Sequence, residues 1–358
     1  MTIGIDTSAL GNRVTGTSRY IECLLKELHK TNFTIKTFSP SIDVYTNKIS
    51  LLNSLPIIRR GGIRRHIFRK FELNKQMMNS GVNYGFFPNY LMPLNFRKPA
   101  AIIIHDLSFI SHPHFYSKAF VWYYIDQLKK VLKSNPIVCT VSETTRKSIV
   151  KYLNIDKNKI FLLQAYADID RIKAKQYLQN SKDVKPYFLY VGHIEPRKNL
   201  FFMIENFLIW KKKSRSDYKL KLVGEIWSSS KKIHAMIKYF SKELDVEFCG
   251  YVNENELSIL YSNASAFVHT SFVEGFGFPV LEAMHYGLPI LCSEGTGTEE
   301  ISKPYSITID SYDNSSLIKG FNQLASKEKH YKEDYIIKYS PHLMNEQLDR
   351  LLNVMGNR

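Results

Sequence analysis

Short apolar runs alternate with longer amphipathic segments along almost the whole chain. In the first half, six apolar runs of strand length lie at residues 2–8, 33–39, 84–88, 100–105, 137–142 and 159–164. Between these runs, apolar residues recur every three or four positions, which predicts helices at about 18–29, 114–134 and 142–153. Strands that alternate with helices in this way indicate a parallel sheet with helices on both of its faces.

The same alternation begins again after a charged, irregular stretch at about residues 168–186. Six further strands are predicted at residues 187–191, 219–223, 246–251, 266–270, 288–292 and 306–310. A last helix, at about 341–355, carries an apolar stripe and lies beyond the second sheet. We therefore expect an α/β protein with two Rossmann-like domains that face a cleft, the first formed by residues 1–168 and the second by residues 169–339.

Length and composition agree with two folded domains. The 358 residues exceed one average domain, and a hydrophobic content of 44% is sufficient for two buried cores. No apolar run reaches the roughly 18 residues that a membrane-spanning helix needs. The four cysteines are far apart and form no Cys-x-x-Cys pair, which favours a reduced, cytoplasmic protein with buried thiols.

A formal net charge of +16 indicates an anionic partner. The densest basic segment, Arg59 to Lys70, contains no acidic residue and is interleaved with isoleucine and phenylalanine. Such a mixture is typical of segments that lie on an anionic membrane surface, although a solvated helix or loop would have the same composition. No nucleic-acid recognition motif is present, so we expect no specific nucleic-acid partner.

The first candidate for chemistry is the turn that begins at Glu274 and follows the predicted strand 266–270. A short helix with Pro279 near its start comes next, and the helix N–H groups, with no β-carbon at Gly275 and Gly277, predict a cradle for an anion. Glu282 projects from the first helical turn. Two carboxylates beside an anion site indicate a ligand that carries both phosphates and hydroxyls, such as a nucleotide-sugar.

The second candidate is Gly192 to Asn199, GHIEPRKN, between the first strand and the first helix of the second domain. Ligands of doubly wound sheets bind at the carboxyl ends of strands, where these side chains lie. Arg197 can bind a phosphate through two hydrogen bonds, and Lys198 can add a point charge. Alone, the two could be surface cations, but the turn at Glu274 at the same edge favours a diphosphate ligand. No residue cluster has metal-ligand spacing, and these cations make a metal unnecessary.

Taken together, the motifs resemble the retaining glycosyltransferases of family four, and among them bacterial mannosyltransferase-like enzymes of polysaccharide and O-antigen synthesis. The resemblance rests on GHIEPRKNL and SFVEGFGFPVLEAMHYGLPILCSE, and on TGTSRY, IHDL and TVSE, which occur in the family's order over nearly the whole chain. It implies the GT-B fold, with two Rossmann-like domains that face a central cleft. The first domain would bind the acceptor and the second the donor, and the C-terminal helix, about residues 340–358, would dock back on the first.

The resemblance also assigns a role to each matching residue. Glu274 would lie near the anomeric carbon of the donor sugar, with His105 on the acceptor side, and these two would be the catalytic residues. Glu282 would bind the ribose hydroxyls. The other donor-binding residues would be Arg197, Lys198, Gly16, Gly275, Phe276, Gly277, Phe278 and Glu300, with backbone N–H groups around Gly277, Phe278 and Val280 completing the cradle.

The activity implied is retaining transfer of a hexose, with mannose favoured, from a nucleotide-diphosphate sugar to a hydroxyl of a glycan. The acceptor would be a glycan, and no cofactor is expected. The basic segment from Arg59 to Lys70 suggests an acceptor linked to polyprenyl diphosphate, so the cytoplasmic protein could lie peripherally on the inner face of the plasma membrane. Because Glu282 is assigned to the ribose, only Glu274 remains near the sugar, which favours front-face substitution over a covalent intermediate.

Four points qualify the interpretation of the sequence. An inactive nucleotide-sugar-binding or regulatory protein would keep the same fold, although the charged residues of the site count against it. A nucleotide-dependent oxidoreductase is disfavoured because neither domain has Gly-x-Gly-x-x-Gly after its first strand. The aromatic runs at residues 86–90 and 122–124 could stack on acceptor sugars or belong to the core. Many relatives also have Arg where this chain has His193, which puts donor choice in question.

Overall fold

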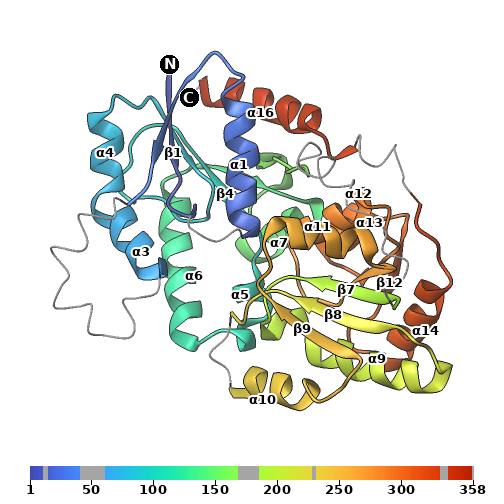
Figure 1. The fold of residues 1–358 in the computed structure, drawn as a ribbon. Coiled ribbons are helices and arrows are strands. Elements are labelled where there is room, and N and C mark those ends of the chain that lie inside the picture. Colours follow the sequence, from blue (N-terminus) through green and yellow to red (C-terminus); the bar gives the residue numbers. More distant parts are fainter. Residues whose placement is uncertain (11–14, 41–60, 168–184, 228–230, 331–337, 357–358) are drawn as a thin grey trace. The chain divides into compact units, whose positions relative to one another are not determined.

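The computed structural model describes residues 1–10, 15–40, 61–167, 185–227, 231–330 and 338–356. The chain divides into two compact units. Unit 1 contains residues 1–141, 145–165 and 341–358, and unit 2 contains residues 142–144 and 166–340. Each unit is built on one six-stranded sheet with parallel strand pairs, which confirms the predicted α/β class (Figure 1).

The sheet of unit 1 has the strand order β2-β1-β3-β4-β5-β6. Its strands are β1 (Thr2–Asp6), β2 (Thr34–Phe38), β3 (Tyr84–Phe87), β4 (Ala100–Ile104), β5 (Ile137–Thr140) and β6 (Ile160–Leu162). Every residue of β3, β4 and β5 is buried, as expected for parallel strands that helices cover on both faces. The chain order reverses between β1 and β3, and ligands of such sheets bind at this point, beyond the carboxyl ends of the strands.

The helices of unit 1 pack around this sheet. They are α1 (Gly16–Leu28), α3 (Gly61–Phe71), α4 (Leu73–Asn79), α5 (Ser108–Ser111), α6 (Lys118–Lys133) and α7 (Glu143–Leu153), with 3-10 turns η1 (Pro113–Phe115) and η2 (Lys157–Lys159). The predicted helix at 114–134 starts later than expected because the Ser117 side chain accepts a hydrogen bond from the Phe120 N–H and caps α6.

The C-terminal helix α16 (Pro341–Gly356) belongs to unit 1 and packs against α1 and β6. Its apolar stripe is buried, as at Leu348 and Leu351. The Gln164 N–H donates to the side chain of Gln347 at 2.7 Å, and Gln347 donates back to the Gln164 side chain at 3.1 Å. The helix therefore docks on the first unit, as the family resemblance implied.

The sheet of unit 2 has the order β12-β11-β10-β7-β8-β9. Its strands are β7 (Tyr187–Val191), β8 (Lys219–Val223), β9 (Val246–Gly250), β10 (Ala266–His269), β11 (Ile290–Ser293) and β12 (Ser306–Ile309). Its helices are α9 (Leu200–Ser214), α10 (Lys231–Phe240), α11 (Glu254–Asn263), α12 (Phe278–His285), α13 (Gly297–Ser302) and α14 (Asn314–Ala325), with the 3-10 turn η3 (Pro196–Lys198). Here the chain order reverses between β7 and β10.

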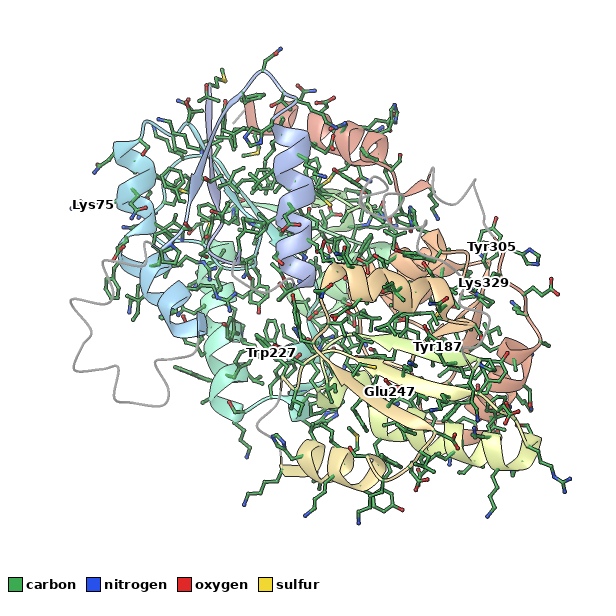
Figure 2. All side chains as sticks on the ribbon, in the orientation of Figure 1. Lys75, Tyr187, Trp227, Glu247, Tyr305 and Lys329 are labelled. Carbon is green, nitrogen blue, oxygen red and sulfur yellow. The ribbon has the colours of Figure 1, made fainter. Side chains whose placement is uncertain are left out.

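The two ends of the unit 2 sheet are marked by Tyr187 and Trp227 (Figure 2). Tyr187 opens β7, whereas Trp227 follows β8 and stacks on His193 with 4.6 Å between the ring centroids. His193 and Trp227 therefore lie at the carboxyl end of the sheet, where the loops that carry the predicted site begin. Among the helices of the described residues, none is long and apolar enough to cross a membrane.

Candidate functional site

Two loops carry the predicted charged residues to one edge of the unit 2 sheet. One follows β7 and contains η3, and the other follows β10 and leads into the turn at Glu274. They lie side by side because β7 and β10 are hydrogen-bonded neighbours. The Phe272 N–H donates to the carbonyl of Arg197 at 3.0 Å, and Thr270 Oγ1 donates to the carbonyl of Lys198 at 3.3 Å. Hydrogen bonds thus join the loops at the residues that carry the charges.

The carboxylate of Glu274 is the centre of an ionic cluster. Its Oε2 atom accepts a hydrogen bond from Lys198 Nζ and lies 3.3 Å from Arg197 Nη1. Arg197 also pairs through Nη2 with Glu195 at 2.8 Å. The side chains of Glu274, Lys198 and Arg197 are only 15%, 8% and 18% exposed. The structure therefore brings three of the predicted site residues into direct contact.

The electrostatics of this cluster fix the charge of Glu274. Burial opposes ionisation of the carboxyl group, but the cations of Lys198 and Arg197 outweigh burial and hold the pKa of Glu274 well below its ordinary 4.5. The carboxylate is therefore ionised at neutral pH. A base with so low a pKa is a weak proton acceptor.

A buried histidine lies beside the cluster and was missed from the sequence. His269, the last residue of β10, has its Nε2 atom 4.0 Å from Glu274 Oε2. Burial, followed by the charge of Lys198, lowers the pKa of His269 to about 3, so the ring is neutral. Its Nδ1 atom is buried and has no hydrogen-bond partner in the part of the chain that the structure describes.

The glycine turn positions α12 beside the ionic cluster. Gly277 caps the helix with φ 108, a conformation that glycine adopts readily, and an added β-carbon would lie 2.5 Å from the Thr298 side chain. The Val280 N–H donates to the Gly277 carbonyl at 3.0 Å. The Val280 N–H thus closes the first helical turn, and its contribution to an anion cradle stays a prediction.

The two phenylalanines of the turn pack inside unit 2 and support the turn. Phe276 and Phe278 are buried, with their rings edge to face at 5.3 Å, and Phe276 also packs against Tyr339. Their side chains stabilise the turn, so the expected donor contacts of these residues would have to come from their backbone.

Glu282 projects from α12 and is held by a tyrosine of α11. The Tyr261 hydroxyl lies 3.0 Å from Glu282 Oε2 and 3.2 Å from the Pro279 carbonyl, and the Tyr261 ring stacks on Tyr286 at 5.2 Å. Tyr261 was not among the predicted site residues. The structure shows that it orients one of the two predicted glutamates.

A third loop, at the start of α13, packs on the turn at Glu274. The Gly297 N–H donates to the Glu274 carbonyl at 2.8 Å, and a β-carbon at Gly297 would lie 2.3 Å from the Gly275 carbonyl oxygen. Only glycine fits this close backbone approach. The sequence signal was the Gly-Thr-Gly-Thr run at residues 295–298, whose partner loop cannot be read from the sequence.

Glu300, the less secure donor-site residue, is already paired. Its carboxylate accepts hydrogen bonds from the N–H groups of Glu143 and Thr144, at 2.8 and 2.7 Å, and from the Thr144 hydroxyl. Residues 142–144 cluster with unit 2. Donor binding through Glu300 would have to replace these bonds, so its role stays a prediction.

The remaining predicted site residues, His105 and Gly16, lie in unit 1. His105 follows β4, its Nε2 atom is 3.1 Å from the Pro88 carbonyl, and its ring packs edge-on against Tyr20 at 4.9 Å. Burial lowers the pKa of His105, so the ring is neutral at pH 7. Gly16 opens α1 directly after the N-cap residue Thr15. Their predicted roles toward the donor and acceptor stay predictions.

The basic segment has two different parts. Arg59 and Arg60 lie outside the described residues, whereas residues 61–70 belong to α3. Arg69 is buried, and it donates to Asp6 Oδ2 at 2.8 Å and to Ser8 Oγ at 3.2 Å. The expectation that Arg69 faces a membrane is therefore wrong, because the residue ties α3 to the carboxyl end of β1. Lys70 is exposed, with Nζ 5.2 Å from the ring centroid of the exposed Phe71.

No metal centre is formed by the described part of the chain, where no three His, Cys, Asp or Glu side chains are arranged to hold an ion. The charges of the cluster are instead balanced within the protein by Lys198 and Arg197.

The fold has been seen in solved glycosyltransferases. The sucrose-phosphate synthase of Thermosynechococcus elongatus aligns with a TM-score of 0.73 at 14% identity, over 99% of both chains. WaaG, a glycosyltransferase of lipopolysaccharide biosynthesis, aligns with a TM-score of 0.64 at 12% identity, over 98% of this chain and 95% of its own. The architecture is that of the GT-B glycosyltransferases.

Residues 168–342 match the family model of Glycosyl transferases group 1. The chain is 29% identical over 232 residues to O-antigen chain mannosyltransferase B of Escherichia coli. The aligned region covers 63% of this chain and 61% of that protein. It is also 29% identical over 258 residues to O-antigen chain mannosyltransferase RfbU of Salmonella typhimurium, over 72% of this chain and 68% of that one. The chain thus matches about three fifths to two thirds of these relatives' length.

Proposed function

We propose that this protein is a retaining glycosyltransferase that moves mannose from a nucleotide-diphosphate sugar to a hydroxyl of a glycan acceptor in cell-surface polysaccharide assembly. The observation that carries the proposal is the ionised carboxylate of Glu274, held by Arg197 and Lys198 at the switch point of the unit 2 sheet. The similarity to O-antigen mannosyltransferases supports mannose as the sugar and O-antigen synthesis as the pathway.

In this proposal Arg197 and Lys198 bind the diphosphate of the donor. Arg197 offers a planar pair of donors that matches two phosphate oxygens, and Lys198 adds a compact charge. Both cations stabilise the negative charge that develops on the leaving group, which needs no metal ion. Glu282, oriented by Tyr261, accepts hydrogen bonds from the ribose hydroxyls.

The charge state of Glu274 supports front-face substitution. A carboxylate in contact with two cations has a low pKa, so it is a weak base and a poor nucleophile. Its negative charge is suited to stabilise the oxocarbenium-like sugar of the transition state. The oxygen of the leaving diphosphate then accepts the proton of the acceptor hydroxyl, and the new bond forms on the face that the diphosphate leaves.

A panel of GDP-, UDP- and dTDP-sugars tests the proposal, with thermal shift for binding and slow hydrolysis for turnover. We expect GDP-mannose to give the largest rise in Tm, because binding to the native state stabilises it. Arg197→Ala should abolish the shift, and Glu274→Ala should abolish hydrolysis. Lys213→Ala, an exposed cation on α9, is the control and should change neither. Stabilisation by UDP- or dTDP-sugars alone would contradict the choice of donor.

A second reading, an inactive nucleotide-sugar-binding or regulatory protein, makes a different prediction. Such a protein would be stabilised by nucleotide-sugars but would hydrolyse and transfer none of them. The intact contact between Glu274, Arg197 and Lys198 favours the enzyme.

We further propose that the acceptor glycan is linked to polyprenyl diphosphate and that the protein binds the inner face of the plasma membrane. The exposed Lys70 and Phe71 at the end of α3 combine a cation with an apolar ring, as interfacial segments do. Sedimentation with anionic vesicles should fall with rising salt, and it should weaken in the variants Lys70→Ala and Phe71→Ser but not in Lys213→Ala. Vesicle binding that is indifferent to salt and to both substitutions would count against this surface.

A further inference from the structure

Helix α6 of unit 1 presents large aromatic side chains that are only partly covered. Of its sixteen residues, Leu128 and Val131 are the buried ones. Phe120, Tyr123 and Tyr124 are neither buried nor fully exposed. Phe120 and Tyr124 pack with part of their surface against the core beneath, so these rings have fixed positions and still reach solvent.

These rings continue into a row that crosses three segments of unit 1. Phe120 and Tyr124 have centroids 4.2 Å apart, and Tyr123 lies 5.3 Å from Tyr124. Tyr116 stacks on Phe120 at 5.3 Å with an angle of 11° between the rings, and Tyr90 lies 5.6 Å from Tyr124. We call these five residues, Tyr90, Tyr116, Phe120, Tyr123 and Tyr124, the aromatic row.

One end of the aromatic row, at Tyr90, lies where a parallel sheet binds ligands. Tyr90 follows β3, and Asp106 follows β4, so both are beyond the carboxyl ends of neighbouring strands. The chain order of this sheet reverses beside β3. Helix α3 lies next to α6, and its His66 accepts or donates a hydrogen bond with the Tyr123 hydroxyl at 2.6 Å (Figure 1).

Polar groups accompany the rings. The Tyr116 hydroxyl lies 2.6 Å from Ser108 Oγ, which donates to Asp106 Oδ1 at 2.6 Å. Asp106 Oδ1 also accepts from the Ser108 N–H at 2.9 Å. The half-buried carboxylate therefore uses one oxygen to accept the N–H and hydroxyl of Ser108, and within the described residues no hydrogen bond is formed by the other.

We propose that the aromatic row, with Asp106, binds a saccharide unit of the acceptor. A pyranose has apolar C–H faces that can cover tyrosine rings and an equator of hydroxyls that can donate to a carboxylate. Pockets for such ligands combine aromatic walls with a few polar groups. The inference rests on the proposed function, since it names the part of the acceptor that unit 1 recognises.

Other ligand classes fit these groups less well. An acyl or polyprenyl chain would cover the tyrosine hydroxyls and Asp106 without pairing them, and an unpaired buried polar group is costly. A phosphate would meet the negative charge of Asp106. Trp122, which is 71% exposed on α6, lies outside the row and gives a control on the same helix.

Saturation-transfer NMR with methyl α-D-mannopyranoside tests the inference, since this method detects weak binding at millimolar concentrations. We expect transfer to the glycoside protons in the full-length protein. Tyr124→Ala should weaken binding about 5- to 10-fold, the effect of one aromatic contact, and Tyr124→Phe should restore most of it. Asp106→Asn, which keeps an oxygen to accept the bonds from Ser108, should weaken binding by a similar factor, and Trp122→Ala should leave it unchanged.

Two outcomes would overturn the inference. One is the absence of transfer to the methyl glycosides of mannose, glucose and galactose alike. The other is binding that Tyr124→Ala and Asp106→Asn leave intact in variants whose circular dichroism and Tm match the parent protein. Slow donor hydrolysis, which needs no acceptor saccharide, separates the two proposals: hydrolysis without glycoside binding contradicts only the saccharide site. Glycoside binding without any sugar-nucleotide binding contradicts only the proposed function.

Discussion

Replacing Glu274 by glutamine removes one negative charge and keeps the size of the side chain. Lys198 would then lose its only ionic partner among the described residues, whereas Arg197 would keep Glu195. Removing one partner of a buried ion pair costs about 3–5 kcal/mol. Since Arg197 keeps a partner and Glu274 is 15% exposed, we expect the lower end of this range, about 3 kcal/mol. For a unit of this size, that lowers Tm by roughly 6–12 °C.

The same substitution, Glu274→Gln, should strengthen the binding of a nucleotide diphosphate. In the parent protein, a diphosphate must share Arg197 and Lys198 with the Glu274 carboxylate. Two unit charges about 6 Å apart repel by roughly 2–3 kcal/mol at an effective dielectric constant near 20, and solvent screening reduces this further. We therefore expect Glu274→Gln to bind GDP about 10-fold more tightly by calorimetry, while transfer and donor hydrolysis are lost.

The pH dependence of stability provides an independent check. The folded pKa of Glu274 lies below its ordinary 4.5, so its ionisation stabilises the protein above that pH and this stabilisation is lost as the pH falls. The difference in Tm between the parent and Glu274→Gln should be full at pH 7 and begin to close below pH 4.5. Glu195→Gln, which affects Arg197 alone, is the matched control and should show a smaller loss. A Glu274→Gln variant as stable as the parent at pH 7, with unchanged GDP affinity, would refute this reasoning.

Three further substitutions test other parts of the structure. Tyr261→Phe removes the hydrogen bond to Glu282 and should weaken GDP binding by about 1 kcal/mol, with a smaller preference for GDP over 2′-deoxy-GDP; an unchanged preference would argue against ribose recognition. Gly297→Ala should lower the free energy of unfolding, measured in urea, by at least about 3 kcal/mol, because the new methyl group overlaps the Gly275 carbonyl. The control Gly81→Ala has open space around it and only an unfavourable φ of +67, so it should lower the free energy of unfolding by about 1 kcal/mol. Arg69→Met should destabilise unit 1 by about 3–5 kcal/mol because it removes the ionic partner of the buried Asp6 carboxylate of β1. A variant as stable as the parent protein that no longer binds vesicles would instead indicate that Arg69 contacts the membrane.

The strands could be predicted from the sequence because parallel strands covered on both faces leave continuous apolar runs. All twelve predicted strands are present among the described residues, and each end agrees within two residues. The helix ends were less predictable, since they depend on single hydrogen bonds such as the Ser117 cap of α6. The environment of Arg69 in α3 could not be predicted, because its burial depends on a carboxylate 63 positions earlier in the chain.

The site was predictable only as far as the strand order allows. Loops that follow parallel strands meet at one edge, which placed Glu274 near Arg197 and Lys198 before their distances were known. Tyr261 and Gly297 were not predicted because they lie in other elements, α11 and the start of α13, whose neighbours are fixed by the pairing of strands far apart in sequence. His269 was not predicted as a site residue because a histidine in an apolar strand looks like part of the core. Only its distance to Glu274 connects it with the site.

The charge balance of the cluster explains why such a site would select a whole nucleotide-sugar. Arg197 and Lys198 are matched by the carboxylates of Glu195 and Glu274, so the cluster is neutral before any ligand binds. An inorganic phosphate would gain little there, because it competes with carboxylates that are already in place and receives only a modest contribution from the N-terminus of α12. In the proposed complex, a nucleotide-sugar would add a ribose contact at Glu282 and hydroxyls that hydrogen-bond to Glu274 itself. The carboxylate that weakens binding of the diphosphate would then be the group that stabilises binding of the sugar, so affinity and selectivity would arise from the same ion pair.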